Sequence, residues 1–314
     1  MQEVINAIKK AKSVIILTHT DPDGDAIGSM IAVHLALKGM GKKTAMYCNN
    51  PVPEMYQFLP ESGKVKDSLG KGKFDLAVAV DCGDAKRVDD GIKLKALART
   101  VVNIDHHPDN TKFGDINLIE KISSVSETLF KLFKKMKVKI TKDIATCLYT
   151  GIMTDTGNFQ YDLTTADTLE AAASLARAGA EISRIAMAVY ETKTLSSVRI
   201  LGAAMYRLET STSGKVAWTV LPKQLMDSLE AKSEDLTGLV DNIRAIKGVE
   251  VAVLFREEED GIKVNFRSKL KVNVSDIAKA LGGGGHIRAS GAIVQGKLDD
   301  VKEKVLAEVF KVIK

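Results

Sequence analysis

Short apolar runs that end in acidic or histidine residues are the strongest constraint on how this chain can fold. Continuous apolar segments at residues 14–19, 74–81 and 100–105 are typical of buried strands, and a helical pattern at residues 26–38 follows the first of them. Apolar strands that alternate with helices predict a parallel sheet covered on both faces. Ligands of such sheets bind at the carboxyl ends of the strands.

Acidic and histidine side chains follow these strands. The first cluster is His19-Thr20-Asp21-Pro22-Asp23-Gly24-Asp25, Asp81 ends the next strand, and Asp105-His106-His107 ends the third. The fourth position is Asp155 alone, which follows a helical pattern over residues 142–153. Carboxylates and imidazoles drawn from four separate elements are typical of a centre for two divalent metal ions, which lie about 3.5–4 Å apart.

Each cluster also has a simpler interpretation. The carboxylates of Asp23 and Asp25 fit a turn rich in Asp, Pro and Gly, and Asp155 fits a helix cap. A turn does not explain the histidine at position 19, and a buried, unpaired carboxylate at Asp81 would be costly. The metal interpretation therefore explains more of these residues together than the separate interpretations do.

From residue 215 the pattern changes to that of a small α+β domain. Its helix at residues 274–281 is followed by four consecutive glycines, which allow backbone N–H groups to approach an anion closely. Together with Arg267, His286 and Arg288, the glycines suggest a grip on a phosphate or carboxylate. A flexible turn explains the glycines equally well.

Composition places limits on the class of protein. The 314 residues suffice for two domains, and 45% hydrophobic and 27% charged residues are ordinary for a globular protein. No apolar run approaches the roughly 20 residues that cross a bilayer, so we expect a cytoplasmic protein. Three cysteines without paired spacing favour reduced thiols. A net charge of +5 suits anionic small molecules or short nucleic acids, and 5% aromatic residues argue against a long stacking platform.

The order of these motifs resembles that of the DHH phosphoesterase superfamily. Within it, the chain is similar to two-domain cytoplasmic members called nanoRNases or oligoribonucleases, many of which also remove the 3'-phosphate of 3'-phosphoadenosine 5'-phosphate. The resemblance covers nearly the whole chain, with all motifs in the expected order. It rests on the following residues: His19, Asp23, Asp25, Asp81, Asp105-His106-His107, Asp155 and the segment Gly282–Gly291.

The resemblance implies an α/β fold with two domains. Residues 1–190 are expected to form a DHH catalytic domain, in which a parallel sheet lies between helices and carries a dinuclear metal site. Residues 191–212 are expected to form a linker helix. Residues 213–314 are expected to form a smaller α+β domain, the DHH-associated substrate-binding domain.

The resemblance also implies which residues hold the metal ions. One ion is expected on His19, Asp23 and Asp81. The other is expected on Asp25, Asp81, His106 and Asp155, so that Asp81 bridges the two ions. Oxygen-rich ligands with two histidines favour Mn²⁺, with Mg²⁺, Co²⁺ or Fe²⁺ as alternatives.

Two further residues are expected to act in catalysis, and a second set to contact the substrate. Asp105 is expected to orient a histidine, and His107 to face the scissile phosphate or the leaving oxygen. The expected substrate contacts come from the C-terminal domain: Arg267, Gly284, Gly285, His286 and Arg288.

The implied activity is that of a metal-dependent hydrolase. Water activated by two metal ions would convert short oligoribonucleotides to mononucleotides, 3'-phosphoadenosine 5'-phosphate to AMP, or both. The expected partners are short RNA or nucleotide bisphosphates as substrates, with no membrane and no stable protein partner except a second copy in a homodimer.

Three alternatives to this activity remain. They are a soluble phosphodiesterase for cyclic dinucleotides or linear diadenylate, an inorganic pyrophosphatase, and a non-catalytic nucleotide-binding module. The glycine run before His286 argues against the pyrophosphatase, because pyrophosphatases of this superfamily have a different C-terminal pattern that is rich in lysine and arginine. The complete set of ligands opposes the non-catalytic module.

Overall fold

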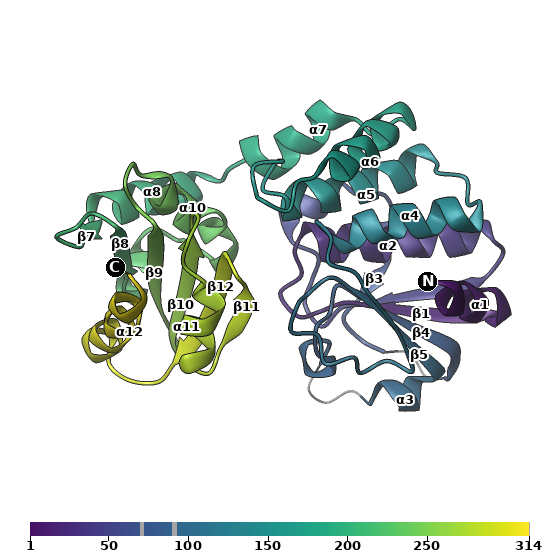
Figure 1. Ribbon diagram of the computed structural model, residues 1–314, viewed down its shortest axis with the longest axis horizontal. Helices are drawn as coiled ribbons and strands as arrows, with labels where there is room; N and C mark the ends of the chain where they lie inside the picture. The colour runs from purple at the N-terminus through teal and green to yellow at the C-terminus, as the bar shows by residue number, and fades with distance from the viewer. Residues whose placement is uncertain (70–71, 90–92, 314) are drawn as a thin grey trace. The chain divides into compact units, whose positions relative to one another are not determined.

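A computed structural model describes residues 1–69, 72–89 and 93–313 (Figure 1). The chain forms two compact units, Met1–Thr192 and Lys193–Lys314. The described residues contain no helix that is long and apolar enough to span a membrane.

The first unit is built on a six-stranded parallel sheet with the order β3-β2-β1-β4-β5-β6. The predicted α/β fold with a parallel sheet is confirmed. After β1 the chain continues to β2 on one side and returns to β4 on the other, so the strand order reverses between β1 and β4. The strands are β1 (Ser13–Leu17), β2 (Lys43–Tyr47), β3 (Val65–Lys66), β4 (Phe74–Val80), β5 (Ala98–Asp105) and β6 (Ile116–Ile119).

Helices cover both faces of this sheet. Most of them pack on one face, and the short α3 lies on the other (Figure 1). The last helix of this unit ends at Ala186, and a π-helical turn (Met187–Glu191) follows it. The helices are α1 (Gln2–Lys10), α2 (Gly24–Gly39), α3 (Leu94–Leu97), α4 (Val125–Met136), α5 (Lys142–Asp155), α6 (Ala166–Arg177) and α7 (Ile182–Ala186), with 3-10 turns at Glu54–Tyr56, Ser62–Lys64 and Ala85–Arg87.

Helix α2 is buried on nearly all sides because it lies between the sheet and α5. Its side chains from Ala26 to Val33 are buried without a polar face, as expected for a helix in the middle of a core. At the crossing with α5, a Cβ at Gly28 would lie only 2.5 Å from the carbonyl oxygen of Cys147. Glycine at position 28 therefore allows the two backbones to approach each other closely.

A segment after β2 is held against α2 by a charged network around Glu61. Its carboxylate lies 2.6 Å from His34 Nε2, 2.6 Å from Lys38 Nζ and 3.1 Å from Lys64 Nζ. The hydrogen bond from Lys38 is the main cause that lowers the pKa of Glu61 to about 2. Burial opposes this shift, and Lys64 and His34 reinforce it.

The second unit is built on a mixed six-stranded sheet with the order β11-β12-β10-β9-β8-β7, in which only the β8–β9 pair is parallel. Along β9, Val253 and Phe255 face α11 and α12, whereas Ala252 and Leu254 face α8 and α10. The strands are β7 (Glu209–Thr210), β8 (Val216–Leu221), β9 (Val251–Glu258), β10 (Gly261–Ser268), β11 (Gly284–His286) and β12 (Ala289–Val294). The helices are α8 (Leu195–Tyr206), α9 (Lys223–Ser228), α10 (Leu239–Ala245), α11 (Val274–Ala280) and α12 (Leu298–Val312), with a 3-10 turn at Ser233–Leu236.

The glycine run is not a free loop, because its second half forms strand β11. This strand pairs with the start of β12, which begins at Ala289. A Cβ at Gly283 would collide with the carbonyl oxygen of Gly291, and one at Gly285 would lie 2.7 Å from that of Ala289. The glycines therefore allow the two backbones of this hairpin to pack closely.

We predict that Gly28→Ala destabilises the protein. The added methyl group meets a backbone oxygen that cannot move aside, and overpacking of this kind costs about 1–3 kcal/mol. Gly39→Ala in the same helix is the matched control, because a Cβ there meets no atom within 4 Å. Urea unfolding followed by circular dichroism measures both variants. Equal stability of the two variants would contradict the close α2–α5 packing.

We predict that the contribution of Glu61 to stability is lost in acid. The pKa of Glu61 is about 2 in the folded protein and 4.5 ordinarily, so folding favours the ionised carboxylate. Its contribution is fully present above about pH 4.5 and disappears as the pH falls towards 2. At pH 6 we expect Glu61→Gln to lower the free energy of unfolding by about 1 kcal/mol.

The test compares the unfolding free energies of wild type and variant at pH 6 and near pH 3. Their difference should shrink at the lower pH. Glu54→Gln, which removes an exposed acid from the same segment, should show no such pH dependence. A Glu61→Gln effect that is constant with pH would exclude the charged network as its cause.

Candidate metal centre

The three strands that end in the predicted clusters are neighbours in the sheet. β1 pairs with β4, and β4 pairs with β5. Hydrogen bonds continue to connect the chain segments at the ends of these strands. Thr18 Oγ1 donates to the carbonyl oxygen of Val80 at 3.0 Å, and the backbone N–H of Asp81 donates to the carbonyl oxygen of Ile104 at 3.0 Å. The residues that follow β1, β4 and β5 therefore meet at one edge of the sheet, where its strand order reverses.

Asp81 lies at the middle of this edge in an unusual backbone conformation. Its φ of 55° is in the left-handed region, which is uncommon for residues other than glycine and is enriched at functional sites. The residue is 1% exposed, and its carboxylate points between two histidines. Its Oδ2 lies 3.6 Å from His19 Nε2, and its Oδ1 lies 3.5 Å from His106 Nε2.

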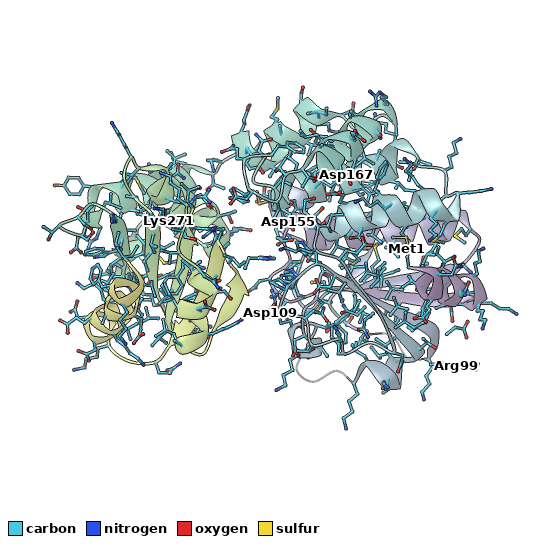
Figure 2. The ribbon with its side chains drawn as sticks, in the orientation of Figure 1. Met1, Arg99, Asp109, Asp155, Asp167 and Lys271 are labelled. Atoms are coloured by element: carbon cyan, nitrogen blue, oxygen red, sulfur yellow. The ribbon has the colours of Figure 1, made fainter. Side chains whose placement is uncertain are left out.

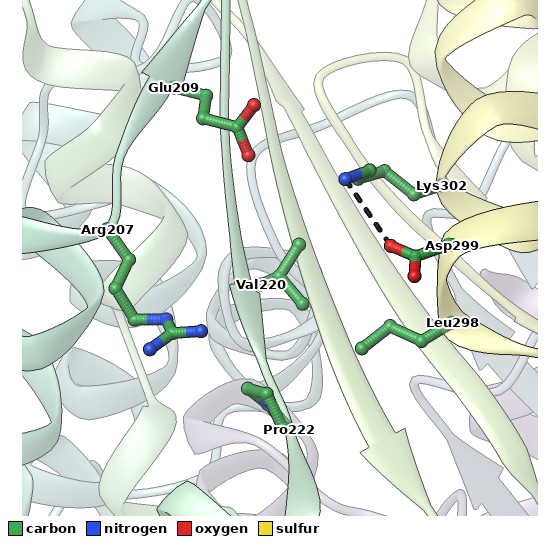
Figure 3. A pocket seen from close by; sticks show the side chains of 7 residues that line it. All are labelled: Arg207, Glu209, Val220, Pro222, Leu298, Asp299 and Lys302. Atoms are coloured by element: carbon green, nitrogen blue, oxygen red, sulfur yellow. Dashed lines mark ion pairs between the residues drawn. The ribbon is translucent and has the colours of Figure 1, made fainter.

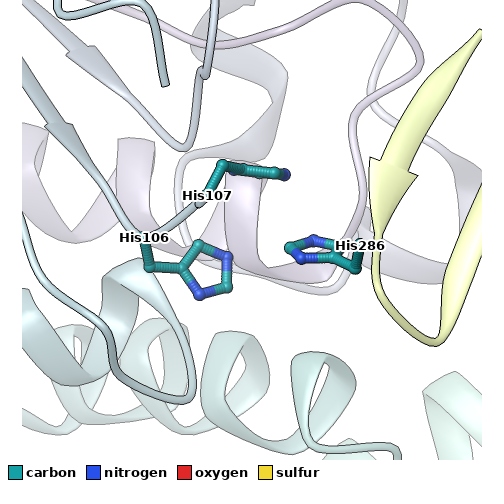
Figure 4. Close-up of side chains that lie close together, drawn as sticks. All are labelled: His106, His107 and His286. Atoms are coloured by element: carbon teal, nitrogen blue, oxygen red, sulfur yellow. The ribbon is translucent and has the colours of Figure 1, made fainter. Parts of the chain in front are cut away.

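Both histidines are oriented by the backbone. The Nδ1–H of His19 donates to the carbonyl oxygen of Thr20 at 2.7 Å, and the Nδ1–H of His106 donates to that of Ile122 at 3.1 Å. In each ring Nε2 is then directed at carboxylate oxygens. Metal-bound histidines are commonly held in this way, with the second ring nitrogen donating to a carbonyl group. Figure 4 shows the neighbouring rings of His106 and His107, whose centroids are 5.0 Å apart.

Asp25 is buried at the start of α2 and receives hydrogen bonds from the first turn of α4. The backbone N–H of Val125 donates to its Oδ2 at 2.6 Å, and the N–H of Ser126 donates to its Oδ1 at 2.9 Å. The N-terminus of a helix attracts negative charge, so α4 stabilises this carboxylate. A Cβ at Gly151 would lie 2.5 Å from Asp25 Oδ1, which explains a glycine inside α5.

The remaining two carboxylates come from helix ends. Asp23 is the exposed N-cap of α2, and its Oδ1 accepts the backbone N–H groups of Asp25 and Ala26 at 3.0 Å each. Asp155 is the last residue of α5 (Figure 2), and its Oδ2 lies 3.1 Å from His106 Nε2.

These side chains form two groups of potential metal ligands that meet at Asp81. In each group, one nitrogen or oxygen atom of every residue lies within 4.8 Å of the corresponding atoms of the others. The first group is His19, Asp23 and Asp81, and the second is Asp25, His106 and Asp155. The oxygens of Asp81 lie beside a histidine of each group, as a bridging carboxylate requires.

The charges of the cluster favour a bound cation. Burial and the neighbouring Asp81 raise the pKa of Asp25 to about 7, and burial and Asp25 raise that of Asp155 well above its ordinary value. Asp81 Oδ1 and Asp155 Oδ2 are buried and accept no hydrogen bond from the described residues. Divalent cations would neutralise these repelling carboxylates and bind both oxygens, so the residues fit a metal centre.

Asp105 and His107 form a pair beside this cluster. The Nδ1–H of His107 donates to Asp105 Oδ1 at 2.8 Å. Burial lowers the pKa of His107, but the hydrogen bond to Asp105 and the charge of Asp81 outweigh it and raise the pKa to about 9. The bond to Asp105 therefore favours the protonated ring of His107.

The predicted substrate residues lie in the second unit. Arg267 on β10 has its Nε 3.3 Å from Asp241 Oδ1. Arg288 donates to the carbonyl oxygens of Val272, at 2.8 Å, and Leu270, so its guanidinium holds the chain before α11. Gly284, Gly285 and His286 form the edge strand β11. Their contacts with substrate stay predictions.

A separate pocket of about 330 Å³ lies in the second unit, between β8 and the start of α12. None of the residues that line it belongs to the predicted site, and its Lys302 pairs with Asp299 at 3.6 Å (Figure 3). The pocket therefore does not change the assignment of the site.

Several residues that support the centre were not predicted from sequence. Ser126 and Gly151 fit around Asp25, Asn110 donates to Asp105, and Asn103 accepts from Asn110. Asn103 carried a signal, because it is a polar residue within an apolar strand. Gly151 carried another, because glycine inside a helix usually marks close packing.

Known proteins resemble the chain over nearly its whole length. The protein named bifunctional oligoribonuclease and PAP phosphatase NrnA from Thermus thermophilus is 35% identical over 98% of this chain and 91% of its own length. The protein of the same name from Bacillus subtilis is 30% identical over 98% and 96%. The crystal structure of an exopolyphosphatase-related protein from Bacteroides fragilis matches with a TM-score of 0.90 and 26% identity, over 99% of this chain and 95% of that one.

Two family models divide the chain between them. The model described as the DHH family, N-terminal domain, matches residues 13–152, which include most of the metal cluster, and the DHHA1 domain matches residues 214–314. Together with the relatives and the geometry of the cluster, these matches show that the chain belongs to the DHH family.

Proposed function

We propose that this protein is a metal-dependent phosphoesterase that hydrolyses short oligoribonucleotides to mononucleotides and 3'-phosphoadenosine 5'-phosphate to AMP. The observation that carries this proposal is the position of the Asp81 carboxylate, with one oxygen beside His19 and the other beside His106. Two groups of ligands that share one carboxylate suit two metal ions acting on a single phosphate.

We propose Mn²⁺ as the metal, held by the two groups described above. Carboxylate oxygens with a single imidazole in each group suit Mn²⁺, with Mg²⁺ or Co²⁺ as alternatives. When bound, the two cations act as Lewis acids that polarise the phosphoryl group and lower the pKa of water.

The chain itself supplies orientation and a proton donor. The backbone bonds of His19 and His106 fix the directions of their rings, and the first turn of α4 fixes Asp25. We propose that His107 donates a hydrogen bond or a proton to the leaving oxygen, since its Nδ1 side is held by Asp105. Nucleoside hydroxyls leave poorly as alkoxides, so a donor at this position lowers the barrier.

The substrate class rests on the relatives. Two proteins that match nearly the whole chain are named for action on oligoribonucleotides and PAP. A net charge of +5 is compatible with such anionic substrates. The cleaved bond is a phosphoester in both, so one centre serves both reactions.

We predict that the purified protein with Mn²⁺ hydrolyses RNA of two to five nucleotides and the bisphosphate nucleotide, and that excess EDTA abolishes both activities. Product formation is measured by chromatography on these substrates, on linear diadenylate and on pyrophosphate. Preferred turnover of diadenylate would indicate the phosphodiesterase, and preferred turnover of pyrophosphate the pyrophosphatase. No turnover of any of these compounds would count against the proposed function and favour the non-catalytic module.

We predict that Asp81→Asn lowers kcat/KM on the order of 1,000-fold, because the metal ions contribute several kcal/mol to the barrier reduction. The same variant should lose the stabilisation that Mn²⁺ gives to the wild type, which is measured as a rise in Tm with Mn²⁺ concentration. The metal-free variant should remain folded, because asparagine has the shape of aspartate. The lost attraction to the three histidines is partly offset by the lower repulsion of Asp25 and Asp155.

Asp143→Asn is the matched control, because it removes an exposed carboxylate from the first turn of α5. It should leave both the activity and the Mn²⁺-dependent rise in Tm unchanged. An Asp81→Asn variant that keeps the Mn²⁺-dependent rise would exclude Asp81 as a metal ligand.

A further inference from the structure

Asn103 is a fully buried amide inside strand β5. Its neighbours in the strand, Val102 and Ile104, belong to the apolar core. A buried amide is costly unless its polar atoms are bonded, with penalties of about 1–3 kcal/mol. Both ends of this amide are bonded: Nδ2 donates to the carbonyl oxygen of Cys82 at 3.0 Å, and Oδ1 accepts from Asn110 at 2.8 Å.

Asn110 connects this amide to the carboxylate of Asp105. Its Nδ2 donates to Asn103 Oδ1 at 2.8 Å and to Asp105 Oδ2 at 2.5 Å. The carbonyl oxygen of Cys82 also lies within reach of this nitrogen, at 3.3 Å. An amide nitrogen carries only two hydrogens, and the bonds to Asn103 and Asp105 are the shorter ones. Its Oδ1 accepts the backbone N–H of Lys112 at 2.6 Å, which fixes the amide plane.

The carboxylate of Asp105 is therefore held on both sides. Oδ2 accepts from Asn110, and Oδ1 accepts from His107 Nδ1. The loop that carries Asn110 is itself attached to the segment that follows β4, because the backbone N–H of Thr111 donates to the carbonyl oxygen of Gly83 at 2.8 Å. A continuous chain of hydrogen bonds thus runs from the Cys82 carbonyl group through two amides and a carboxylate to the His107 ring.

We propose that Asn110, supported by Asn103, is a positioning residue that sets the orientation of the His107 ring through Asp105. The proposal rests on the proposed role of His107 at the leaving oxygen. A neutral amide suits this task, because it donates to Asp105 without adding a positive charge that would compete with the metal ions. The Asp105 carboxylate is then free to turn only within the limits of two opposed hydrogen bonds.

Asn110→Asp is the sharpest variant, because aspartate has the same shape but cannot donate to Asp105. Asn110→Ala removes the donor without adding charge. We expect either variant to lower kcat about 10- to 100-fold, the usual cost of losing a group that orients a metal-site residue. KM and the affinity for Mn²⁺ should change less than about twofold, because neither the proposed ligands nor the substrate is touched.

Asn117 provides matched controls. Its side chain also makes two bonds to the backbone, donating to the Gly114 carbonyl oxygen at 2.8 Å and accepting the Gly114 N–H at 3.0 Å. Its backbone pairs with that of Asn103, but neither side-chain bond involves Asn110, Asp105 or His107. Asn117→Asp and Asn117→Ala should lower Tm about as much as the Asn110 variants and leave kcat unchanged. If the Asn117 variants lost as much kcat as the Asn110 variants, Asn110 would have only a structural role, and the proposal would be wrong.

A double-mutant cycle with His107→Ala measures whether the effect of Asn110→Ala on kcat depends on His107. If Asn110 acts through His107, Asn110→Ala should cause no further loss of kcat in the His107→Ala background. Losses that multiply in full would overturn the proposal, as would failure of both Asn110 variants to fold.

A second measurement does not depend on activity. In metal-free wild type, the His107 Nδ1–H that is bonded to Asp105 should give a downfield proton NMR resonance, which Asn110→Asp should shift or broaden and Asn117→Asp should not. An unchanged resonance would overturn the proposal even if no substrate is turned over. Lack of turnover by the wild type would instead count against the proposed function alone.

Discussion

The burial of negative charge at Asp81 is the constraint on which the first unit depends. The residue is 1% exposed, carries a carboxylate whose Oδ1 accepts no hydrogen bond from the described residues, and adopts a left-handed backbone conformation. A stable protein tolerates such a group only if cations or protonated histidines lie beside it. His19, His106 and His107 all lie within 3.6 Å of its oxygens, and together they hold the pKa of Asp81 well below its usual range although burial opposes this.

Neutral groups around the cluster position its charged side chains. The backbone of α4 donates to Asp25, two carbonyl groups orient His19 and His106, and the amide of Asn110 holds Asp105. Because none of these partners carries a charge, none competes with a metal ion for the carboxylates. Each metal-binding side chain is thus oriented by the fold before any ion binds, which reduces the entropy lost on binding.

The sequence predicted the sheet and the types of side chain at its edge well. Apolar strands alternating with helices are a local pattern, and strand ends that carry Asp81 or His106 are visible in the order of residues. The glycine run was less well predicted, because a flexible loop and a close-packed hairpin have the same local pattern of residues. The pairing of strand β11 with β12, for example Gly285 with Ser290, shows that the run belongs to a hairpin. The supporting role of Asn110 was also missed, since nothing near it in sequence marks it as a partner of Asp105.

By itself, then, the sequence determined the chemistry of the centre: which acids and histidines are present, in what order, and that the ends of parallel strands gather them. The tertiary structure alone decided which atoms face one another. The bonds from Val125 and Ser126 to Asp25 join residues about 100 positions apart. Contacts of this kind depend on how helices pack over the sheet, and packing is a property of the whole core, which no local pattern of residues contains.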